Sequence, residues 1–525
     1  MLSWIKRQMG YSTTPSAPPK GAKGEPRLAP KSSYDAAKTH KDNTRHWSNA
    51  DGLSANAGNS AEVRRILRNR SRYEDGNNSY VNGLTGDRAN ETIGTGPRLQ
   101  LTLPERFDDP DFQVGVDVRP DLARAVEHRF KGWCEAIGLL DKLLVMDESD
   151  TREGEVFAFR FVNPKPRDAV QLDVRLYEAD QVDTPDFDYS AANAVPGIVF
   201  DEFGNPEWYH VLKSHPGDAT AGYFGGFGGQ PYEKIPARQM IHWFRPRRAG
   251  QARGIPAFTS SLPLNAILRR VTLASALTAE AQSRINAVIE QEHALPDYSG
   301  TGAGTQPDDG GEEIQFAGTH AMVLSAGQTA KALAATAPGP AYSSFKGEIL
   351  TEAGRPINAP GNISRGTSAD MNYSSGRLDM QQWQRAIRIR RRRLERIVLD
   401  WLFRAWVAEA VLIPGYLPAG LPPLTEWRWN WRWDAFTSID PVKDATAATE
   451  RLANGTSTLD RECGDLGEDW EEVQDQRLIE EAREIRRRKE MKLGPKAGAA
   501  KPTTKPAPVP ADGKDEDAAE DAADE

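Results

Sequence analysis

Apolar residues at helical spacing predict one unusually long helix in the middle of the chain, over Ser261–Glu292. At about 1.5 Å per residue this helix would extend on the order of 45 Å, longer than most helices of a compact enzyme core. The polar, glycine-rich stretch Ser299–Gly311 ends the pattern, and two short strands follow at Ile314–Phe316 and Ala321–Leu324. A shorter helix is then predicted over Ser343–Ala353. The order is therefore a long helix, a small β insertion and a short helix.

The chain before this long helix predicts a mixed α+β domain. Ser60 suits the N-cap of one helix, and Pro120 suits the first turn of another, which extends to Gly138. Alternating apolar and polar residues predict strands over 157–161 and 172–176 and a hairpin over 198–212. In the first helix the packed side would hold Val63, Ile66, Leu67 and Tyr73. The arginines around them, which are Arg64, Arg65, Arg68, Arg70 and Arg72, are interpreted as a solvated face.

A polar loop and a basic helix follow. Pro360–Arg377 is rich in glycine, serine and asparagine and predicts a loop, and the next helix is predicted from Trp383 to Val407. Seven arginines fall between Arg385 and Arg396. The apolar stripe comprises Trp383, Ile387, Leu394, Ile397, Val398 and Trp401, and the arginines expected to project away from it are Arg388, Arg391, Arg392 and Arg396. Such a basic face is either solvated or assembled against an anion.

The C-terminal part predicts a tryptophan-lined strand and a helical end. Trp427, Trp429, Trp431 and Trp433 alternate with polar residues, so a strand can place all four indoles on one face. Burial of that face is favoured over stacking on nucleic-acid bases. Asp440 and Pro441 predict the start of a helix that closes at Asn454–Gly455, and a last charged helix is predicted over Asp469–Met491. The tail after Lys492 predicts disorder, since its final fifteen residues hold eight acids and one lysine.

Composition narrows the class of protein. A length of 525 residues exceeds one hydrophobic core, and a mean hydropathy of -0.61 indicates a polar, soluble chain. Cys134 and Cys463 match neither a disulfide framework nor a zinc ligand set, which fits a reducing compartment. The sequence predicts neither a signal peptide nor a membrane span, so we expect a cytoplasmic protein. A net charge of -9 argues against a high-affinity DNA coat but is compatible with DNA passing by.

Motifs for enzyme chemistry are absent from the sequence. It lacks a phosphate-binding P-loop, an HExxH pair, a CxxC pair and a GxSxG turn. We therefore expect no catalytic residue, no cofactor and no metal. His210 and His215 lie near Asp218 without the spacing of metal ligands, and His242 is interpreted as a packed strand residue.

Several motifs, in the same order, resemble those of the lambda-type family of phage portal proteins. They are RSRYEDGNNSYVNG (Arg70–Gly83), RPRRAGQARGIPAF (Arg245–Phe258), MNYSSGRLDMQQW (Met371–Trp383) and the segment from Ile439 to Val473. The resemblance extends from about Tyr34 to Lys489. It implies a ring, dodecameric in family members, at one capsid vertex. Through this ring an ATP-driven terminase would load DNA, and DNA would later leave.

The resemblance also implies how the chain divides into the parts of a portal-type ring subunit. These parts are an α/β wing, a long-helix stem, a small β clip insertion and a helical crown. The implied ranges are an extended arm over 1–59, a wing over 60–256 and 378–438, a stem over 257–293 and 343–359, a clip over 294–342, a tunnel loop over 360–377, a crown over 439–491 and a disordered acidic tail over 492–525.

Candidate site residues follow from these implied parts. Arg365 and Asn372 on the tunnel loop are candidates for transient contact with DNA phosphates, because a polar loop can follow passing DNA without fixed base readout. The clip acids, which are Asp308, Asp309, Glu312 and Glu313, would dock the terminase or a head-completion protein, or serve solubility alone. The basic helix with Arg388, Arg391, Arg392 and Arg396 would face a neighbouring subunit's acids, the coat protein or packaged DNA. The set Arg247, Arg248, Gly250, Arg253 and Gly254 would fix the approach to the stem.

The implied partners are further copies of the chain in a homo-dodecameric ring, double-stranded DNA in transit, the terminase large subunit, the major capsid protein and head-completion or tail connector proteins, with no membrane. The implied location is the capsid portal vertex of a virion, after assembly in the host cytoplasm. Two other functions stay open. One is a metal-dependent packaging nuclease that uses the carboxylates Asp108, Asp109 and Asp111, and the other is a minor capsid interaction protein.

Overall fold

The computed structural model describes residues 45–103, 120–166, 168–184, 194–218, 231–284, 288–291, 313–316, 319–322, 328–331, 339, 341–369, 372–436 and 440–492. Residues 45–54 belong to a separate compact unit, in which 45–49 form a turn. The described residues combine helices and strands, so the predicted α+β class is confirmed. None of the described helices has the length and apolar character needed to cross a membrane.

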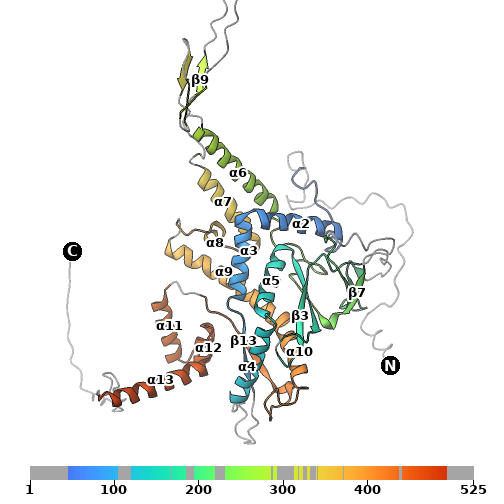
Figure 1. The fold of residues 1–525 in the computed structure, drawn as a ribbon, viewed down its shortest axis with the longest axis vertical. Helices are drawn as coiled ribbons and strands as arrows, with labels where there is room; N and C mark the ends of the chain where they lie inside the picture. The colour runs from blue at the N-terminus through green and yellow to red at the C-terminus, as the bar shows by residue number, and fades with distance from the viewer. Residues whose placement is uncertain are drawn as a thin grey trace, which may run out of the picture. The chain divides into compact units, whose positions relative to one another are not determined.

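Four described helices precede the first large sheet (Figure 1). Their bounds are Ala61–Asn77 (α2), Ser79–Ile93 (α3), Pro120–Ala136 (α4) and Leu139–Arg152 (α5). The predicted start of α2 is confirmed, because the N–H of Val63 donates to the Ser60 hydroxyl. The Asn78 side-chain oxygen accepts from the N–H of Tyr80 and begins α3 directly afterwards. Local capping therefore explains where this helical layer begins and breaks.

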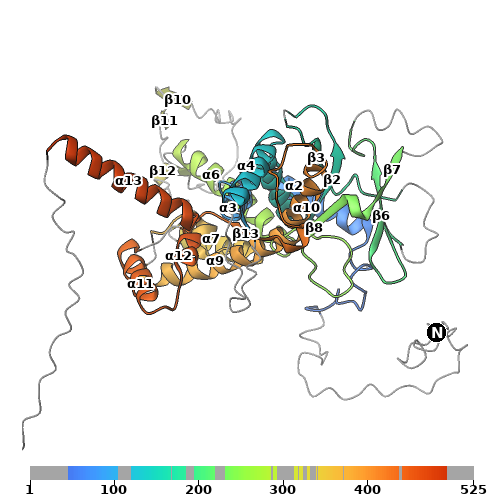
Figure 2. The ribbon, with the colours of Figure 1, turned by 90° about the horizontal axis from the view of Figure 1, so that it is seen from below.

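Two antiparallel sheets follow, and Figure 2 shows β2, β3 and β8 together and β6 and β7 beside them. In the first sheet β2 (Glu155–Val162) lies between β3 (Leu172–Tyr177) and β8 (Met240–Phe244). The second sheet has the order β4 (Ala194–Val195), β5 (Ile198–Phe200), β6 (Pro206–Leu212), β7 (Tyr232–Pro236), and the 3-10 turn η2 (Ala237–Gln239) leads into β8. These strands confirm the predicted strands and hairpin.

The largest hydrophobic core gathers residues from α4, α5, β2, β3 and the later helix α10 (Asp400–Ala410). At its centre the ring of Phe130 lies 5.2 Å from the rings of both Phe403 and Trp406, edge to face. A second core packs α3 against α9 around Trp383 and Ile387. The apolar stripe predicted for the basic helix thus packs into the interior, with Ile397 and Trp401 partly buried.

The predicted tryptophan face is confirmed as a buried surface. β13 (Arg428–Arg432) pairs antiparallel with β1 (Arg98–Thr102), and the 3-10 turn η5 (Leu424–Glu426) precedes it. The indole N–H groups of Trp429 and Trp431 donate to one oxygen of Asp400, at 2.9 and 2.8 Å. Each indole therefore keeps an acceptor while its ring packs on the main core, as an amphipathic aromatic requires.

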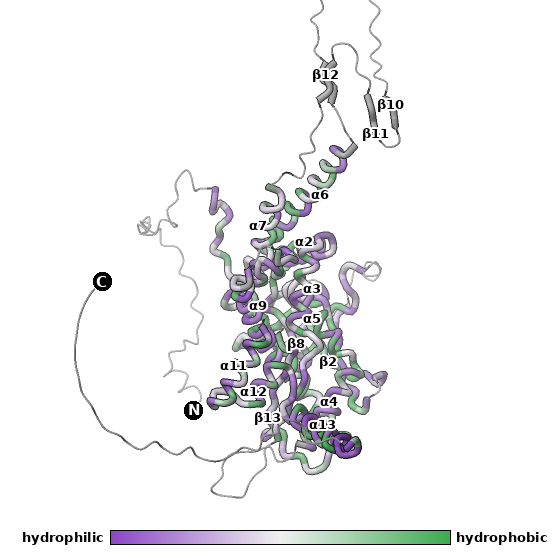
Figure 3. The backbone as a smooth tube through the Cα atoms, turned by 90° about the vertical axis from the view of Figure 1, so that its left-hand side faces the viewer, coloured by the Kyte–Doolittle hydropathy of each residue, from purple (hydrophilic) through white to green (hydrophobic). Residues whose placement is uncertain are grey.

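The predicted long helix is confirmed over most of its length but is wrong at its C-terminal end. Helix α6 ends at Arg284 (Leu262–Arg284), and Val288–Gln291 is instead strand β9, which pairs antiparallel with β12 (Gln328–Lys331). β-branched Val288 and Ile289 suit a strand once a partner strand supplies hydrogen bonds. The predicted insertion is confirmed as the hairpin β10 (Glu313–Phe316) and β11 (Thr319–Met322). The predicted second helix is α7 (Tyr342–Gly354), which lies beside α6 (Figures 1 and 3).

The predicted polar loop over 360–377 is also partly helical. The 3-10 turn η3 (Arg355–Ile357) and the short helix α8 (Gly361–Arg365) follow α7, and α9 (Tyr373–Leu394) begins ten residues before the predicted start. Gly366, in the left-handed conformation with φ 67°, ends α8. The π-helical turn η4 (Glu395–Leu399) joins α9 to α10, so the basic helix continues without a break to Ala410.

Three helices complete the described chain: α11 (Pro441–Ala453), α12 (Leu459–Asp465) and α13 (Trp470–Glu490). The predicted cap of α11 is confirmed, because Asp440 accepts from the N–H of Lys443. The last helix was predicted to begin at Asp469, which instead caps α13 by accepting from the N–H of Glu471. Helix α12 was not predicted. The salt bridge from Arg124 to Glu471, at 3.2 Å, connects α4 with α13.

Candidate functional site

Arg365, the first residue predicted to face DNA, lies at the end of α8 and beside α7. Its Nε–H donates to the carbonyl oxygen of Gly347 and to the hydroxyl of Thr351, both at 3.0 Å. Its Nη2 lies 3.1 Å from Glu348 Oε1. The guanidinium thus joins α8 to α7 and already has a carboxylate partner, while part of the side chain stays exposed.

A polar cavity of about 380 Å³ adjoins Arg365, between α7, α8 and α9. Sequence reasoning missed Arg355, Asp379 and Gln382, which also line it. Asn372 is not among the lining residues, because its side-chain oxygen accepts from the N–H of Ser375 at 2.9 Å and caps α9. The two predicted DNA-facing residues therefore do not share one cavity.

The basic helix has arginines on both of its faces. Arg388, Arg392 and Arg396 are exposed, as predicted, and Arg392 is 81% exposed in its side chain. Arg391 is buried, so its prediction as a projecting residue is wrong. Its Nε, Nη1 and Nη2 donate to the carbonyl oxygens of Thr92, Asp434 and Glu91, each at 2.9 Å. Three carbonyls that converge on one guanidinium compensate its desolvation.

Arg390, which sequence reasoning missed, is the most strongly paired arginine of this helix. Its Nε and Nη1 lie 2.5 Å from Asp147 and 2.7 Å from Asp150, both buried on α5. Burial disfavours the guanidinium charge, but the two carboxylates outweigh that effect and raise the pKa of Arg390 above its ordinary value. Arg390 follows Trp383 and Ile387 at helical spacing, so its place on the packed stripe was visible in the sequence.

The Arg247–Gly254 segment carries a buried charged centre at the approach to α6. Arg253 Nε donates to both oxygens of Glu155 at 2.9 Å, and Glu155 also accepts from Gly254 N–H at 2.8 Å. Burial alone would raise the pKa of Glu155, but Arg253 and His242 outweigh it and hold this pKa well below its usual range. The predicted close backbone approach is confirmed, since a Cβ on Gly254 would collide with the carbonyl of Gly154.

The clip acids Asp308, Asp309 and Glu312 lie outside the described residues, as do Asp108, Asp109 and Asp111. Glu313 begins strand β10. The predicted packing of His242 is confirmed, because its ring stacks on Phe157 and Phe244 with centroids 4.3 and 4.2 Å away. Burial lowers the pKa of His242 despite the neighbouring Glu155.

One carboxylate cluster in the described chain has the geometry of metal ligands. His215 Nε2 lies 3.3 Å from Glu178 and 3.9 Å from Asp180. Arg72 contacts both carboxylates, at 2.9 and 2.7 Å, and Arg68 contacts Asp180 at 2.6 Å. Guanidinium groups thus already compensate these acids, which favours a structural ion-pair cluster over a metal site.

The α6–α7 pair keeps much of its predicted apolar stripe on the surface of the single chain. Ile267, Leu273 and Leu277 of α6 are 49%, 55% and 63% exposed, and Phe345 of α7 is 49% exposed. Leu268 is buried. Figure 3 shows apolar and polar residues interspersed along α6. Of the residues predicted to pack along this helix, Ile267 and Leu277 are therefore uncovered in one copy of the chain, while Leu264 and Val271 are half-buried.

Comparisons with known proteins place these features in a family. The profile described as "Phage portal protein, lambda family" matches residues 40–391. A "Probable portal protein" of Halomonas phage phiHAP-1 is 26% identical over 389 residues, which are 70% of this chain and 71% of that protein. "Portal protein B" of Escherichia phage lambda is 22% identical over 390 residues, 68% of each chain.

Solved structures give a weaker likeness. A chain of the structure titled "Virion of native gene transfer agent (GTA) particle" aligns at 14% identity over 77% of this chain and 94% of that chain. The TM-score of 0.38 is too low to carry a conclusion about shared architecture.

Proposed function

We propose that copies of this chain close into a ring at one vertex of a capsid, because the chain belongs to the lambda family of phage portal proteins. The chain is a portal protein rather than an enzyme of DNA processing. Packaged DNA passes through the ring during terminase-driven loading and again during ejection. Virion assembly is then its place of action, and a dodecamer is the proposed size of the ring.

The observation that carries the proposal is the uncovered apolar surface of α6 and α7. Isolated exposed leucines are ordinary, but Ile267, Leu273 and Leu277 repeat along one helix of a soluble, polar chain. A neighbouring copy can cover the surface by a heterologous contact, in which different patches of the two copies meet. Repetition of such a contact about one axis gives a closed ring.

The parts of the subunit take their roles from this arrangement. The sheets of β2–β8 and the helices α2–α5 belong to the wing, α6 and α7 to the stem, β10–β12 to the clip, and α11–α13 to the crown. The acids Asp308, Asp309, Glu312 and Glu313 of the clip meet the terminase large subunit and later the head-completion or tail connector proteins. The major capsid protein contacts the outside of the ring.

Arg365 and Asn372 lie at the DNA-facing side of the ring in this proposal. In this proposal the exposed arginines of the basic helix, Arg388, Arg392 and Arg396, also attract phosphates without fixing a sequence. Because Arg365 is already paired with Glu348, its contact with DNA is transient. Arg391 has no part in DNA contact, because it is buried.

Negative-stain electron microscopy of the purified chain tests the proposal most directly. We expect ring-shaped particles with a central hole at micromolar concentration. A folded chain that stays monomeric at every concentration contradicts the ring. Incubation with plasmid DNA and magnesium or manganese should leave the plasmid intact, whereas cleavage would support the nuclease alternative.

Arg365→Gln is expected to lower DNA packaging by terminase in an in vitro assay and to leave ring formation unchanged. Removing the charge weakens the phosphate contact, while the ring depends on the α6–α7 surface. Glu348→Gln is the matched control, because it removes the carboxylate partner and keeps the arginine charge. Loss of rings in Arg365→Gln would show that the residue serves assembly instead.

A further inference from the structure

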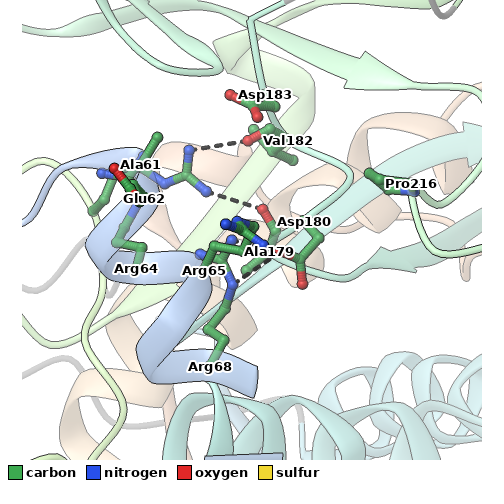
Figure 4. A pocket seen from close by; sticks show the side chains of 11 residues that line it. Ala61, Glu62, Arg64, Arg65, Arg68, Ala179, Asp180, Val182, Asp183 and Pro216 are labelled. Carbon is green, nitrogen blue, oxygen red and sulfur yellow. Dashed lines mark hydrogen bonds and ion pairs between the residues drawn. The ribbon is translucent and has the colours of Figure 1, made fainter. Parts of the chain in front are cut away.

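A cavity of about 400 Å³ lies between the first turns of α2 and the Ala179–Asp183 segment that follows β3. Figure 4 shows Arg64, Arg65 and Arg68 on α2 at one side of it and Asp180 and Asp183 at the other. The cavity lies away from the α6–α7 surface and from the Arg365 cavity, and the proposed function assigns it no role. Because several arginines line the cavity, we compare the ion pairs that each of them forms.

Two of the lining arginines, Arg253 and Arg68, already form ion pairs with carboxylates of the same chain. Arg253 is paired with Glu155 and donates to the carbonyl oxygens of Val182 at 3.0 Å and Ala179 at 3.1 Å. Arg68 lies 2.6 Å from Asp180 and 3.8 Å from Glu155. Asp180 and Glu155 are thus already paired with these two guanidiniums.

Arg64 is different, although it is only 3% exposed. Its Nη1 donates to the carbonyl oxygen of Asn59 at 2.6 Å, but its buried Nε has no acceptor. Among the described residues, no carboxylate oxygen lies within 4.0 Å of its guanidinium. Burial and the neighbouring Arg253 together lower the pKa of Arg64 to about 10. Glu155 acts in the opposite direction, but its effect is smaller than that of Arg253.

A buried guanidinium without an anion is costly, because desolvation is not offset by an opposite charge. The space that an anion would occupy is present in the adjoining cavity. The N-terminal end of α2, which also lines the cavity, adds the partial positive charge of its backbone N–H groups. Three independent features therefore favour an anion at one place.

The walls also restrict the kind of anion. Asp183 and Glu62 line the cavity and would repel a doubly charged phosphate more strongly than a singly charged group. Ala61, Val182 and Pro216 supply apolar surface, which suits a carboxylate carried on carbon. A flat carboxylate can also accept two hydrogen bonds from the guanidinium fork of Arg64.

We propose that this cavity is a binding site for one carboxylate group, held by Arg64. The group is supplied either by an aspartate or glutamate side chain of a second copy of the chain or by a small free carboxylate. The first source rests on the proposed ring, whereas the second does not. The chemistry at Arg64 is the same for both.

The test compares Arg64→Met with the control Arg70→Met, which changes an exposed arginine of α2 that does not line the cavity. The thermal midpoint of the unassembled chain is measured in sodium chloride and in sodium acetate of equal ionic strength. In chloride, Arg64→Met is expected to raise the midpoint, because it removes an unpaired buried charge. Acetate should raise the midpoint of the wild type and of Arg70→Met, but not that of Arg64→Met.

The same measurement on assembled rings identifies the source. If a second copy supplies the carboxylate, acetate has no effect on wild-type rings and Arg64→Met lowers their midpoint. If the source is free, the acetate effect persists in the rings. Equal lowering of the midpoint by Arg64→Met in all conditions, with the same acetate response as the wild type, overturns the site.

A measurement without a variant covers the case in which Arg64→Met does not fold. Cryo-electron microscopy of wild-type rings, prepared with and without acetate, should show density within hydrogen-bond distance of the Arg64 guanidinium in at least one preparation. Continuity of this density with a neighbouring copy indicates the protein source, and separate density that needs acetate indicates the free one. An empty cavity in both preparations overturns the proposal.

Discussion

The sheet domain, formed by α2–α5 and β2–β8, and the α6–α7 pair distribute their side chains in opposite ways. The sheet domain buries charges, such as Glu155 and Arg253, and supplies most of them with partners from its own chain. The α6–α7 pair leaves Leu273 and Leu277 in solvent. The first region thus satisfies most of its buried groups within one copy, while the second leaves apolar side chains uncovered.

The two regions also differ in how strongly their interactions specify one structure. A buried ion pair adds little net stability compared with an apolar pair, but it strongly penalises any arrangement that separates its members. An apolar surface tolerates many arrangements and gains free energy from whatever covers it. The sheet domain therefore specifies one internal structure, whereas in the proposed ring the α6–α7 pair supplies a general driving force for contact between copies.

Arg253→Met is the strongest way to break the sheet domain. It leaves Glu155 buried without its main cation, so we expect the free energy of unfolding to fall by about 3–5 kcal/mol. Urea unfolding of the unassembled chain measures the change. Arg392→Gln is the control, because it removes an exposed arginine and should change stability by less than about 0.5 kcal/mol. Similar small effects of both variants would contradict the contrast between the regions.

Glu127→Gln tests a half-buried carboxylate that lacks a strong partner. Burial raises the pKa of Glu127 to about 7, against a hydrogen bond from Leu101 N–H, and the nearby acids Asp469 and Glu472 add to the rise. From about pH 4.5 to pH 7 the folded chain holds a proton that the unfolded chain loses, so stability falls as pH rises. At pH 8 the variant should be more stable by up to about 3 kcal/mol.

The measurement for Glu127→Gln is urea unfolding at pH 5 and at pH 8. At pH 5 the two proteins should differ much less than at pH 8, since the wild-type carboxyl is then largely protonated in the folded chain. An equal difference at both pH values would show that the side chain does not titrate in this range.

The double variant Leu273→Ala/Leu277→Ala should have the smallest effect on the stability of the single chain. It tests whether the exposed side chains of α6 serve association between copies. Both side chains are more than half exposed, so the free energy of unfolding should change by less than about 0.5 kcal/mol. Ring formation, followed by mass photometry, should require higher concentrations because apolar contact area is lost. Leu268→Ala is the buried control and should destabilise the single chain by about 2–5 kcal/mol. Unchanged assembly would remove α6 from the interface.

Local signals predicted much of the fold. Caps at Ser60, Asp440 and Asp469 act within four residues of the chain, so sequence spacing is enough to place them. Strand alternation placed the tryptophans of β13 on a packed face for the same reason. The end of α6 could not be read locally, because β9 depends on pairing with β12 much later in the chain.

The sites were harder to predict because buried arginines need distant acceptors. On α2 the buried side chains include Arg64 and Arg68, whereas Val63 and Tyr73 are exposed. The packed and solvated faces are therefore the reverse of those predicted. Arg68 forms ion pairs with Asp180 and Glu155, which lie outside α2. Helical spacing within α2 does not show these partners, so it predicted that the apolar side would pack. In the same way the buried position of Arg391 depends on carbonyl groups of α3 and of the segment after β13.

The π-helical turn η4 sets the angular phase between two cores that share one continuous helix. Before it, Trp383 and Ile387 fill the core against α3, and after it Phe403 and Trp406 fill the core against α4. A π turn holds one residue more than an α turn, so deleting one residue from Glu395–Leu399 would leave a regular helix but rotate α10 by about 100°. Both aromatic rings would then leave their core, while the first core stayed filled. The length of this turn is therefore as constrained as the identity of the residues that it aligns.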